Sequence, residues 1–379
     1  MDPQRRSLLH VAAGFLMGAS STAQAYERVR PRPLVFPADH GAHPTFRTEW
    51  WYITAWLERS QQGPCGLQLT FFRSRTTYPD NSPSAFAPTQ LLFAHAALSV
   101  PEQSRLLHAQ RAARAGFGLA SAAIGDTQVR VGGWSLERDA NDGYHALVKT
   151  DAFDYSLRFR APGPPVLQGL NGVSAKGPGP YQASYYYSRP QLEVTGELRL
   201  TAPNGVAQAS AAAVQSVRGR AWLDHEWSST LLEAGAVGWD WIGINLHDGG
   251  HLMAFQTRDA AGNARWRHLA WRDARGRSLG LNAWAQGPLF EPLRWWQSSV
   301  SGARWPVAMR LRLQSTPSGA ARILRLLPLL DAQEVDARAS TGGFYWEGAV
   351  RLLDGDRDDS PEIGRGYLEL TGYAQAVAL

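Results

Sequence analysis

Apolar and polar residues alternate with a period of two along most of the chain, and turn-forming residues separate the alternating segments. Because successive side chains of a β-strand point to opposite faces, this pattern predicts strands. Helical periodicity is limited to residues 105–123, an Ala- and Arg-rich stretch that we expect to hold one or two turns. The pattern therefore predicts an all-β protein. Its strands form two series, 49–57, 66–73, 91–100, 129–137, 153–160 and 192–200, then 221–227, 239–246, 251–257, 266–271, 307–313, 323–327, 344–353 and 366–373.

Two series of strands at this spacing predict two antiparallel barrels or sandwiches. We place the join near Ser216, where the Ala-rich segment 207–214 ends. Residues 26–216 would then form the first domain and residues 217–379 the second. The composition agrees with sheets, because the chain has 37 Gly, 23 Pro, 15 Trp, 12 Tyr and 13 Phe but only 4 Met, and turn formers and aromatic residues favour β-structure.

Tryptophan is unevenly distributed. It occurs at positions 50, 51, 56 and 134, and every other tryptophan lies at or beyond position 222. A small barrel can enclose one small apolar ligand, and aromatic side chains suit the lining of such a cavity. Alternatively, the rings simply fill a core, since large aromatic side chains bury much area anywhere.

The first 25 residues have the three parts of an export signal in order. Arg5-Arg6-Ser7-Leu8-Leu9 is a twin-arginine motif, Val11 to Met17 is a short apolar stretch, and Ala23-Gln24-Ala25 is an A-x-A cleavage site. The sequence thus predicts a twin-arginine signal peptide over residues 1–25 and export of a folded protein to a periplasm. No later apolar run approaches the roughly 18 residues of a membrane-spanning helix, so we expect no transmembrane segment in the mature chain.

Several function classes are disfavoured by charge and motif content. The formal net charge is +5, carried by scattered arginines rather than the basic stripe that nucleic-acid binding needs. Cys65 is the only cysteine, which excludes an internal disulfide and a thiolate metal cluster. Gly276-Arg277-Ser278-Leu279-Gly280 matches G-x-S-x-G, yet no histidine follows His268, so the order Ser, acid, His cannot be met. Phosphate loops and dinucleotide fingerprints are absent, and we expect no cofactor and no nucleic-acid partner.

The polar cluster Asp224-His225-Glu226 lies in an apolar segment between Trp222 and Trp227. On a strand, Asp224 and Glu226 share one face and His225 the other. Charged groups are costly to bury unless each is paired. One interpretation is a catalytic site with a buried acid of raised pKa beside an aromatic wall. The other is a hydrogen-bonded structural network where the two barrels meet.

Other polar residues give weaker signals. His247 precedes Asp248-Gly249-Gly250 and reads as a turn residue, and strand alternation separates the three residues 224–226, so we expect no metal site among them. His40 and His43 lie in a loop before a strand, where a histidine is usually solvated. The aromatic residues that we expect to bind a ligand are Trp227, Trp239, Trp241, Trp51, Tyr185 and Tyr186.

Several motifs together resemble the AttH-like family of secreted lipocalin-like proteins, which are related to carotenoid 1,2-hydratases. The resemblance covers essentially the whole mature chain and implies two lipocalin-like barrels packed side by side. It also links the Asp-His pair and the aromatic residue two positions later to the site of the hydratases. Their Tyr-x-Asp on the next strand is absent, because this chain reads His251-Leu252-Met253-Ala254-Phe255 there. The motifs are Thr48–Tyr52 (TEWWY), Ser174–Gly177 (SAKG), Ala183–Ser188 (ASYYYS), Trp222–Trp227 (WLDHEW) and Gly366–Tyr373 (GYLELTGY).

The resulting hypothesis is a cofactor-independent hydratase acting on a hydrophobic polyene or terpenoid. Asp224 or Glu226 would protonate the alkene, and His225 would orient or deprotonate the attacking water. Tryptophan faces would stabilise the developing carbocation. The alternatives are a non-catalytic periplasmic carrier of an apolar ligand, or a pericyclase-like or hydrolase activity.

Overall fold

The computed structural model describes residues 26–60, 62–201, 214–230, 232–279, 281–283, 289–315 and 321–377. The expected signal peptide, residues 1–25, lies outside the described residues. Strands dominate, and the helical content of the described residues is two short 3-10 segments, η1 (Ala38–His40) and η2 (Pro101–Gln103). The predicted all-β class is therefore confirmed. None of the described helices is long or apolar enough to cross a membrane.

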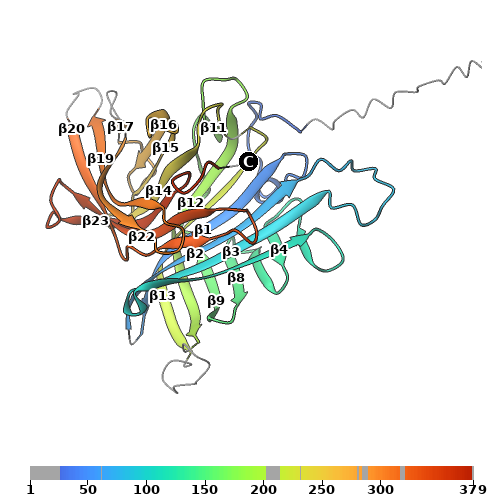
Figure 1. Cartoon of the computed structure of the whole chain (residues 1–379), viewed down its shortest axis with the longest axis horizontal. Helices are drawn as coiled ribbons and strands as arrows, with labels where there is room; N and C mark the ends of the chain where they lie inside the picture. The colour runs from blue at the N-terminus through green and yellow to red at the C-terminus, as the bar shows by residue number, and fades with distance from the viewer. Residues whose placement is uncertain are drawn as a thin grey trace, which may run out of the picture.

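The first sheet contains thirteen antiparallel strands, of which eleven form a nearly closed barrel (Figure 1). Its order is β4-β3-β2-β1-β13-β12-β9-β8-β7-β6-β5, with β10 and β11 also paired to β12. The strands are β1 (Thr48–Arg59), β2 (Gln62–Arg75), β3 (Gln90–Val100), β4 (Arg105–Arg114), β5 (Ala120–Ala122), β6 (Gln128–Val131), β7 (Trp134–Arg138), β8 (Tyr144–Lys149), β9 (Phe153–Arg160), β10 (Val166–Leu167), β11 (Val173–Ala175), β12 (Ala183–Leu200) and β13 (Gln215–Ser228).

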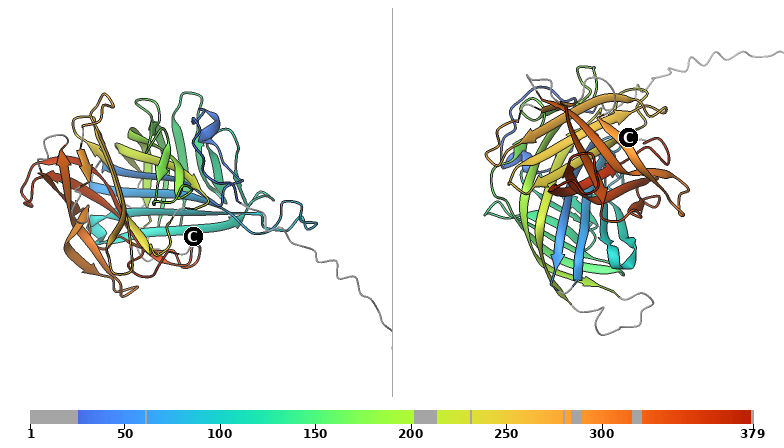
Figure 2. Two further views of the ribbon diagram at one scale, coloured as in Figure 1. Left: turned by 90° about the horizontal axis from the view of Figure 1, so that it is seen from above. Right: turned by 90° about the vertical axis from the view of Figure 1, so that its left-hand side faces the viewer.

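The second sheet contains ten strands, and its main path of eight strands curves into a half-barrel (Figure 2). Its order is β16-β15-β14-β23-β22-β20-β19-β17, with β18 paired to β19 and β21 to β22. The strands are β14 (Gly238–Leu246), β15 (His251–Arg258), β16 (Ala264–Arg272), β17 (Leu281–Ala283), β18 (Phe290–Gln297), β19 (Arg304–Ser315), β20 (Ala321–Pro328), β21 (Glu334–Asp336), β22 (Phe344–Asp354) and β23 (Glu362–Leu370).

Two sequence-based expectations need correction. Residues 105–123, expected to include helical turns, instead contain strands β4 and β5, and β4 pairs with β3 along its whole length. The join expected near Ser216 falls inside β13, which pairs with β1 and β12 of the first sheet. The change from the first sheet to the second comes after Ser228 and before Gly238.

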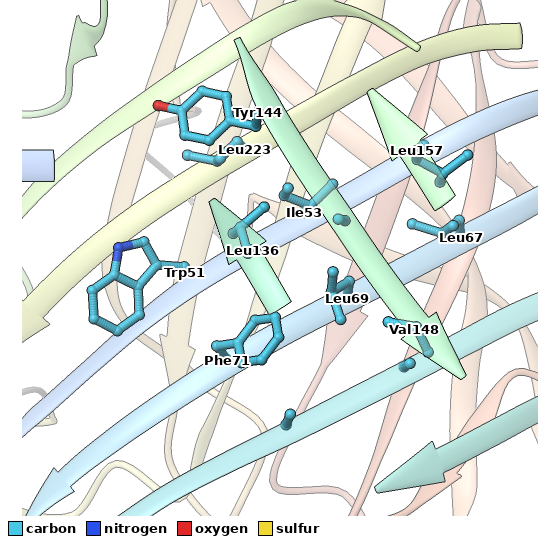
Figure 3. Close-up of a cluster of buried hydrophobic side chains, with 14 of the residues drawn as sticks. Trp51, Ile53, Leu67, Leu69, Phe71, Leu136, Tyr144, Val148, Leu157 and Leu223 are labelled. Atoms are coloured by element: carbon cyan, nitrogen blue, oxygen red, sulfur yellow. The ribbon is translucent and has the colours of Figure 1, made fainter. Parts of the chain in front are cut away.

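The interior of the first barrel is filled with side chains from alternate positions of its strands (Figure 3). Trp51 and Ile53 of β1, Leu69 and Phe71 of β2 and Leu223 of β13 are all fully buried there. The intervening residues of the same strands point outward. On β1, β2 and β13 the second sheet packs against part of this outer face, whereas Glu58, Arg218 and Arg220 near the strand ends remain exposed.

The two sheets approach closely where β1, β2 and β13 meet β14, β22 and β23. A Cβ atom built on Gly66 of β2 would lie 2.5 Å from the hydroxyl oxygen of Tyr367 and 2.6 Å from Cβ of Ala349. These separations are too short for any side chain. Glycine at position 66 therefore permits the contact between the sheets.

Candidate functional site

A cavity of about 580 Å³ lies between the outer face of the first barrel and the facing side of the second sheet. Strand pairing places the side chains that enter it in rows. On the barrel, Tyr52 is directly opposite Asp224 and Trp50 is opposite Glu226. On the second sheet, Glu369 lies between Trp241 and Glu347 on neighbouring strands. Residues opposite one another in an antiparallel pair share a face, so both walls combine carboxyl groups with aromatic rings.

Asp224 is buried, and its carboxyl group lines the cavity. Oδ1 accepts hydrogen bonds from Ser188 Oγ at 2.5 Å and Trp222 Nε1 at 2.7 Å, and Oδ2 accepts one from the Tyr186 hydroxyl at 2.6 Å. A carboxylate offers about four lone-pair positions, so one position on Oδ2 is left for a proton or a ligand. Burial raises the pKa of Asp224 to about 7, although the three donors pull it down.

Glu226 lies two residues further along the same face and is paired with a buried lysine. Lys176 Nζ is 2.8 Å from Glu226 Oε1, which also accepts a hydrogen bond from Ser184. The ammonium group lies 4.0 Å from the ring centre of Phe255 and 4.9 Å from that of Tyr186. The charge of Glu226 is therefore balanced locally, whereas that of Asp224 is not.

Glu347 and Glu369 form a carboxyl pair on the opposite wall. They are cross-strand neighbours on β22 and β23. Tyr52 donates a 2.6 Å hydrogen bond to Glu347 Oε2 from the first sheet, and Trp239 Nε1 donates a 3.0 Å bond to Glu369 Oε1. Burial raises the pKa of Glu369 to about 8 and also raises that of Glu347, which is held up further by the charge of Glu369. Near neutral pH the pair thus retains at least one proton.

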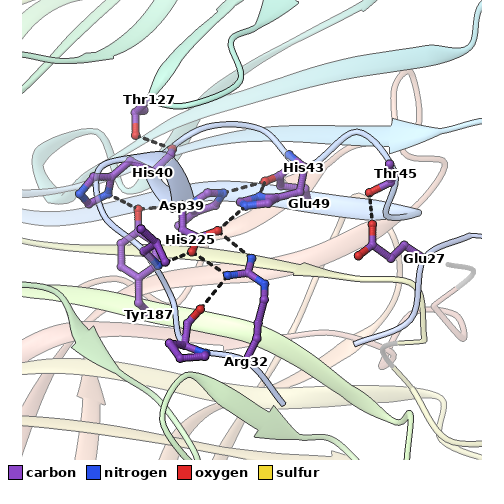
Figure 4. Close-up of polar contacts among 12 residues, drawn as sticks. Glu27, Arg32, Asp39, His40, His43, Thr45, Glu49, Thr127, Tyr187 and His225 are labelled. Carbon is purple, nitrogen blue, oxygen red and sulfur yellow. Dashed lines mark hydrogen bonds and ion pairs between the residues drawn. The ribbon is translucent and has the colours of Figure 1, made fainter. Parts of the chain in front are cut away.

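A second polar network lies inside the first barrel, on the other side of β13 (Figure 4). His225 Nε2 lies 2.9 Å from Glu49 Oε1, and His225 Nδ1 lies 3.2 Å from the Tyr187 hydroxyl. The His225 ring stacks on Trp51 at 4.7 Å. Burial lowers the pKa of His225, so the ring is neutral near pH 7. The alternation of β13 keeps this imidazole out of the cavity that Asp224 enters.

Charged partners satisfy Glu49 at the centre of this network. Arg73 Nε donates to Glu49 Oε2 at 2.7 Å, and His43 Nδ1 lies 2.7 Å from Glu49 Oε1. His43 Nε2 lies 3.0 Å from Asp39 Oδ1, and Arg32 pairs with Asp39 at 2.7 Å. Burial opposes ionisation of Glu49, yet the positive charges of Arg73 and His43 hold the pKa of Glu49 well below its usual value. The network is an ion-paired core of the barrel end.

Among the residues that the structure describes, the possible metal ligands that converge belong to that network. Donor atoms of His43, Glu49 and His225 lie within 4.8 Å of one another. Both imidazole nitrogens already share Glu49 Oε1, and Arg73 occupies its other oxygen. A cation entering there would have to displace these bonds and lie beside a guanidinium group, so the donor set fits an ion-paired network better than a metal centre.

The site residues predicted from the sequence fall into two groups, one in the cavity between the sheets and one in the interior of the first barrel. Asp224, Glu226, Tyr186, Trp239 and Trp241 line the cavity. The other four are buried inside the first barrel, on the opposite side of its wall from Asp224: they are His225, Trp227, Trp51 and Tyr185. His40 and His43, expected to be solvated, are buried and half-buried, because their loop closes over the barrel end.

Sequence reasoning missed several cavity residues. Glu347 is the lone acid in Phe344–Val350, and Glu369 the lone acid in Gly364–Leu370. A single acidic residue within a strand that is otherwise largely apolar is a usable signal, because burial of such a group needs a reason. Tyr52 and Lys176 stand in the motifs that carry the family resemblance, but nothing local marks them as cavity residues.

Comparison with known proteins identifies the family. The sequence profile described as AttH-like matches residues 27–373. An AttH-type protein of Nitrosomonas europaea is 42% identical, with a TM-score of 0.77 over 92% of this chain and 100% of that chain. No curated protein matches the chain.

Two further solved structures share the fold at low identity. Kievitone hydratase from Nectria haematococca is 14% identical, with a TM-score of 0.64 over 93% of this chain and 97% of that chain. CghA with bound Sch210972 is 13% identical, with a TM-score of 0.53 over 89% of this chain and 90% of that chain. On the profile match and the identity to the Nitrosomonas protein, the chain belongs to the AttH-like family.

Proposed function

We propose that the protein is an exported, cofactor-independent enzyme that adds water to a carbon–carbon double bond of a hydrophobic small molecule, of the polyene or terpenoid class. The observation that carries this proposal is a buried carboxyl group, Asp224, whose pKa of about 7 keeps it partly protonated at neutral pH inside a cavity of about 580 Å³. That volume lies within the usual range for small-molecule sites. The signal sequence of residues 1–25 supports export to a periplasm.

The reaction begins with proton transfer from Asp224 Oδ2 to one alkene carbon, which leaves a carbocation at the other. A general acid works best when its pKa lies near the working pH. Tyr186, Ser188 and Trp222 hold the Asp224 carboxyl in place and stabilise the carboxylate that remains. Together these bonds favour the ionised product of the proton transfer.

Water then adds to the cation and gives up one proton. His225 was expected to receive it, but its ring faces the interior of the barrel. The carboxylate that Asp224 becomes in the first step lines the same cavity and can take up this proton. Asp224 is thereby regenerated as the acid, and the net reaction is alkene plus water to alcohol.

The fold is compatible with this assignment. A hydratase, kievitone hydratase, shares the two-sheet architecture at 14% identity. The second candidate function is a non-catalytic carrier of an apolar ligand, which the aromatic cavity and the export signal favour equally. The Asp224 carboxyl, with its free lone-pair position, favours the enzyme.

A turnover assay separates the two candidates. The purified mature chain is incubated with an acyclic carotenoid and with a prenylated phenol, and products are analysed for a mass increase of one water. Asp224→Asn should lose the product, whereas Asp240→Asn should keep it after correction for folded protein. Asp240 is a matched control, because it is buried and hydrogen-bonded to Gln256 and Arg258 but does not line the cavity. Binding of either compound without any mass change would contradict the hydratase and favour the non-catalytic carrier.

A further inference from the structure

The cavity holds more carboxyl groups than it has cations to neutralise. Asp224, Glu226 and Glu49 line it from the first sheet, and Glu347 and Glu369 from the second. Glu49 is paired with Arg73 at 2.7 Å. Lys176 pairs with Glu226 at 2.8 Å. Within the described part of the chain, no ion pair joins a cation to Asp224, Glu347 or Glu369. The segments left undescribed after residue 25 contain no Lys, Arg or His that could supply one.

The two arginines that line the cavity are engaged elsewhere. Arg73 donates to Glu49 at 2.7 Å inside the barrel and to two backbone carbonyls of the neighbouring loop. Arg47 lies over the ring of Tyr26 at 5.8 Å. The carboxyl groups of Asp224, Glu347 and Glu369 therefore face the cavity space without a paired cation, and each one that ionises places a negative charge there.

Aromatic faces surround this charge. The ammonium group of Lys176 already occupies a cage formed by Phe255, Tyr186 and the Glu226 carboxylate. Trp241 pairs with Phe255 across β14 and β15, and Trp239 binds Glu369 through its indole nitrogen. Rings and carboxylates together are the chemistry that holds a desolvated cation. The cavity walls can therefore surround a cationic ligand with aromatic rings and carboxyl groups, as they already do for the Lys176 ammonium group.

We propose that the cavity recognises a positive centre carried on an apolar body, with Glu347 and Glu369 as its counter-charge. The centre is either an ammonium group of the ligand or the carbocation formed by alkene protonation, and in the second case this inference rests on the proposed function. A neutral ligand of the same shape gains the apolar contacts but not the charge compensation. A carboxylate ligand is repelled.

Three probes of nearly one shape test the inference on the full mature chain. They are trimethyl(3-phenylpropyl)ammonium, its neutral isostere with a tert-butyl group in place of trimethylammonium, and 4-phenylbutanoate. Titration calorimetry, with tryptophan fluorescence as a second readout, should show the ammonium probe binding at least about tenfold more tightly than the isostere. The carboxylate should bind more weakly than both. Equal affinities for the ammonium and neutral probes would overturn the inference.

Variants show which residues cause the preference for the ammonium probe over its neutral isostere. The double variant Glu347→Gln and Glu369→Gln should bind the ammonium probe no better than the neutral one, with the affinity for the neutral probe unchanged. Glu193→Gln, a partly exposed carboxyl on the solvent side of β12, should keep the full preference. Persistence of the preference in the double variant would contradict the assignment of these residues.

A wild-type measurement covers the case in which the double variant does not fold. Because burial raises the pKa of Glu369 to about 8 and that of Asp224 to about 7, the ammonium probe should bind more tightly at pH 9 than at pH 6, whereas the isostere should not change. A preference that is absent at both pH values would overturn the inference. The other titratable or charged groups facing this site are Glu226, Glu347, Lys176, His95, Tyr52, Tyr186, Tyr345, Arg47, Glu49 and Arg73.

The turnover assay distinguishes the two sources of charge. If a neutral alkene is hydrated and the ammonium probe inhibits competitively, the positive centre is the carbocation. Tight binding of the ammonium probe without turnover of the alkene would contradict the proposed function but support an ammonium ligand. Turnover of the alkene without any preference for the ammonium probe over its neutral isostere would contradict this inference alone.

Discussion

Asp224 and His225 are consecutive residues of β13, yet their side chains lie in two separate polar environments. The Asp224 carboxyl enters the cavity between the sheets, where the Tyr186 hydroxyl donates to it at 2.6 Å. The His225 imidazole lies inside the first barrel, 2.9 Å from Glu49. One strand therefore separates a candidate proton donor from an ion-paired network, and the predictions below depend on that separation.

Replacement of the proposed acid should abolish hydration while the fold persists. Asp224→Asn keeps the shape and most hydrogen bonds but cannot donate the reacting proton, so we expect a loss of kcat/KM of at least about 100-fold. In the wild type the acid must be protonated, so activity should fall as the pH rises through about 7. A pH–rate profile by product analysis checks both points. An Asn variant with the wild-type rate would contradict the role of Asp224.

The same carboxyl should make stability depend on pH. Its pKa is raised from 3.8 unfolded to about 7 folded, so the folded state binds the proton more tightly. Stability is lost as the pH rises between about 4 and 7, by on the order of 4 kcal/mol in full. The free energy of unfolding of Asp224→Asn relative to wild type should therefore increase from pH 5 to pH 8. Buried histidines titrate alike in both proteins and cancel in this difference.

Denaturant titrations of the two proteins at several pH values provide the measurement. A difference that stays constant with pH would mean that Asp224 is ionised in the folded protein throughout this range.

The barrel network should matter for stability and not for chemistry. Glu49→Gln leaves Arg73 buried without its partner, and we expect a loss of about 3–5 kcal/mol. His225→Asn should also destabilise, while activity per folded molecule stays within a few-fold of wild type. His247 forms an exposed pair with Glu362, so His247→Asn should change the free energy of unfolding by less than about 0.5 kcal/mol. Complete loss of activity in a well-folded His225→Asn protein would show that the imidazole takes part in catalysis.

The contact between the sheets should be sensitive to a single methyl group. In Gly66→Ala the new Cβ atom would meet Tyr367 and Ala349 at 2.6 Å or less, and we expect a loss of about 1–3 kcal/mol. Gly133→Ala is the matched control, since nothing lies within 4 Å of its Cβ position. Thermal unfolding of both variants measures the difference. Equal stability of the two would mean that the sheets are less tightly packed than described.

Much of the fold could be predicted from the sequence, because alternation fixes strands and strand faces. The pattern placed Asp224 and Glu226 on one side of β13 and His225 on the other, which is what the structure shows. It could not show which face met which sheet, since that depends on long-range pairing. For the same reason the sequence pattern predicts a boundary near Ser216, although β13 completes the first barrel between β1 and β12.

The cavity itself was only half predictable. Trp239 and Trp241 were chosen for their aromatic character and do line it, whereas Trp51 and Trp227 have the same character and fill the barrel. Glu347 and Glu369 are distant in sequence from residues 224–226 and become their neighbours only when the half-barrel packs on the barrel. Amino-acid composition shows neither which tryptophans line the cavity nor which distant acidic residues join them.

The most direct test of the account is a crystal structure of the mature chain soaked with the acyclic carotenoid, the prenylated phenol or the ammonium probe. We predict ligand density between the two sheets, in contact with the Asp224 carboxyl and the Trp241 ring. Density inside the first barrel beside His225 and Trp51, with the space between the sheets empty, would contradict the central claim.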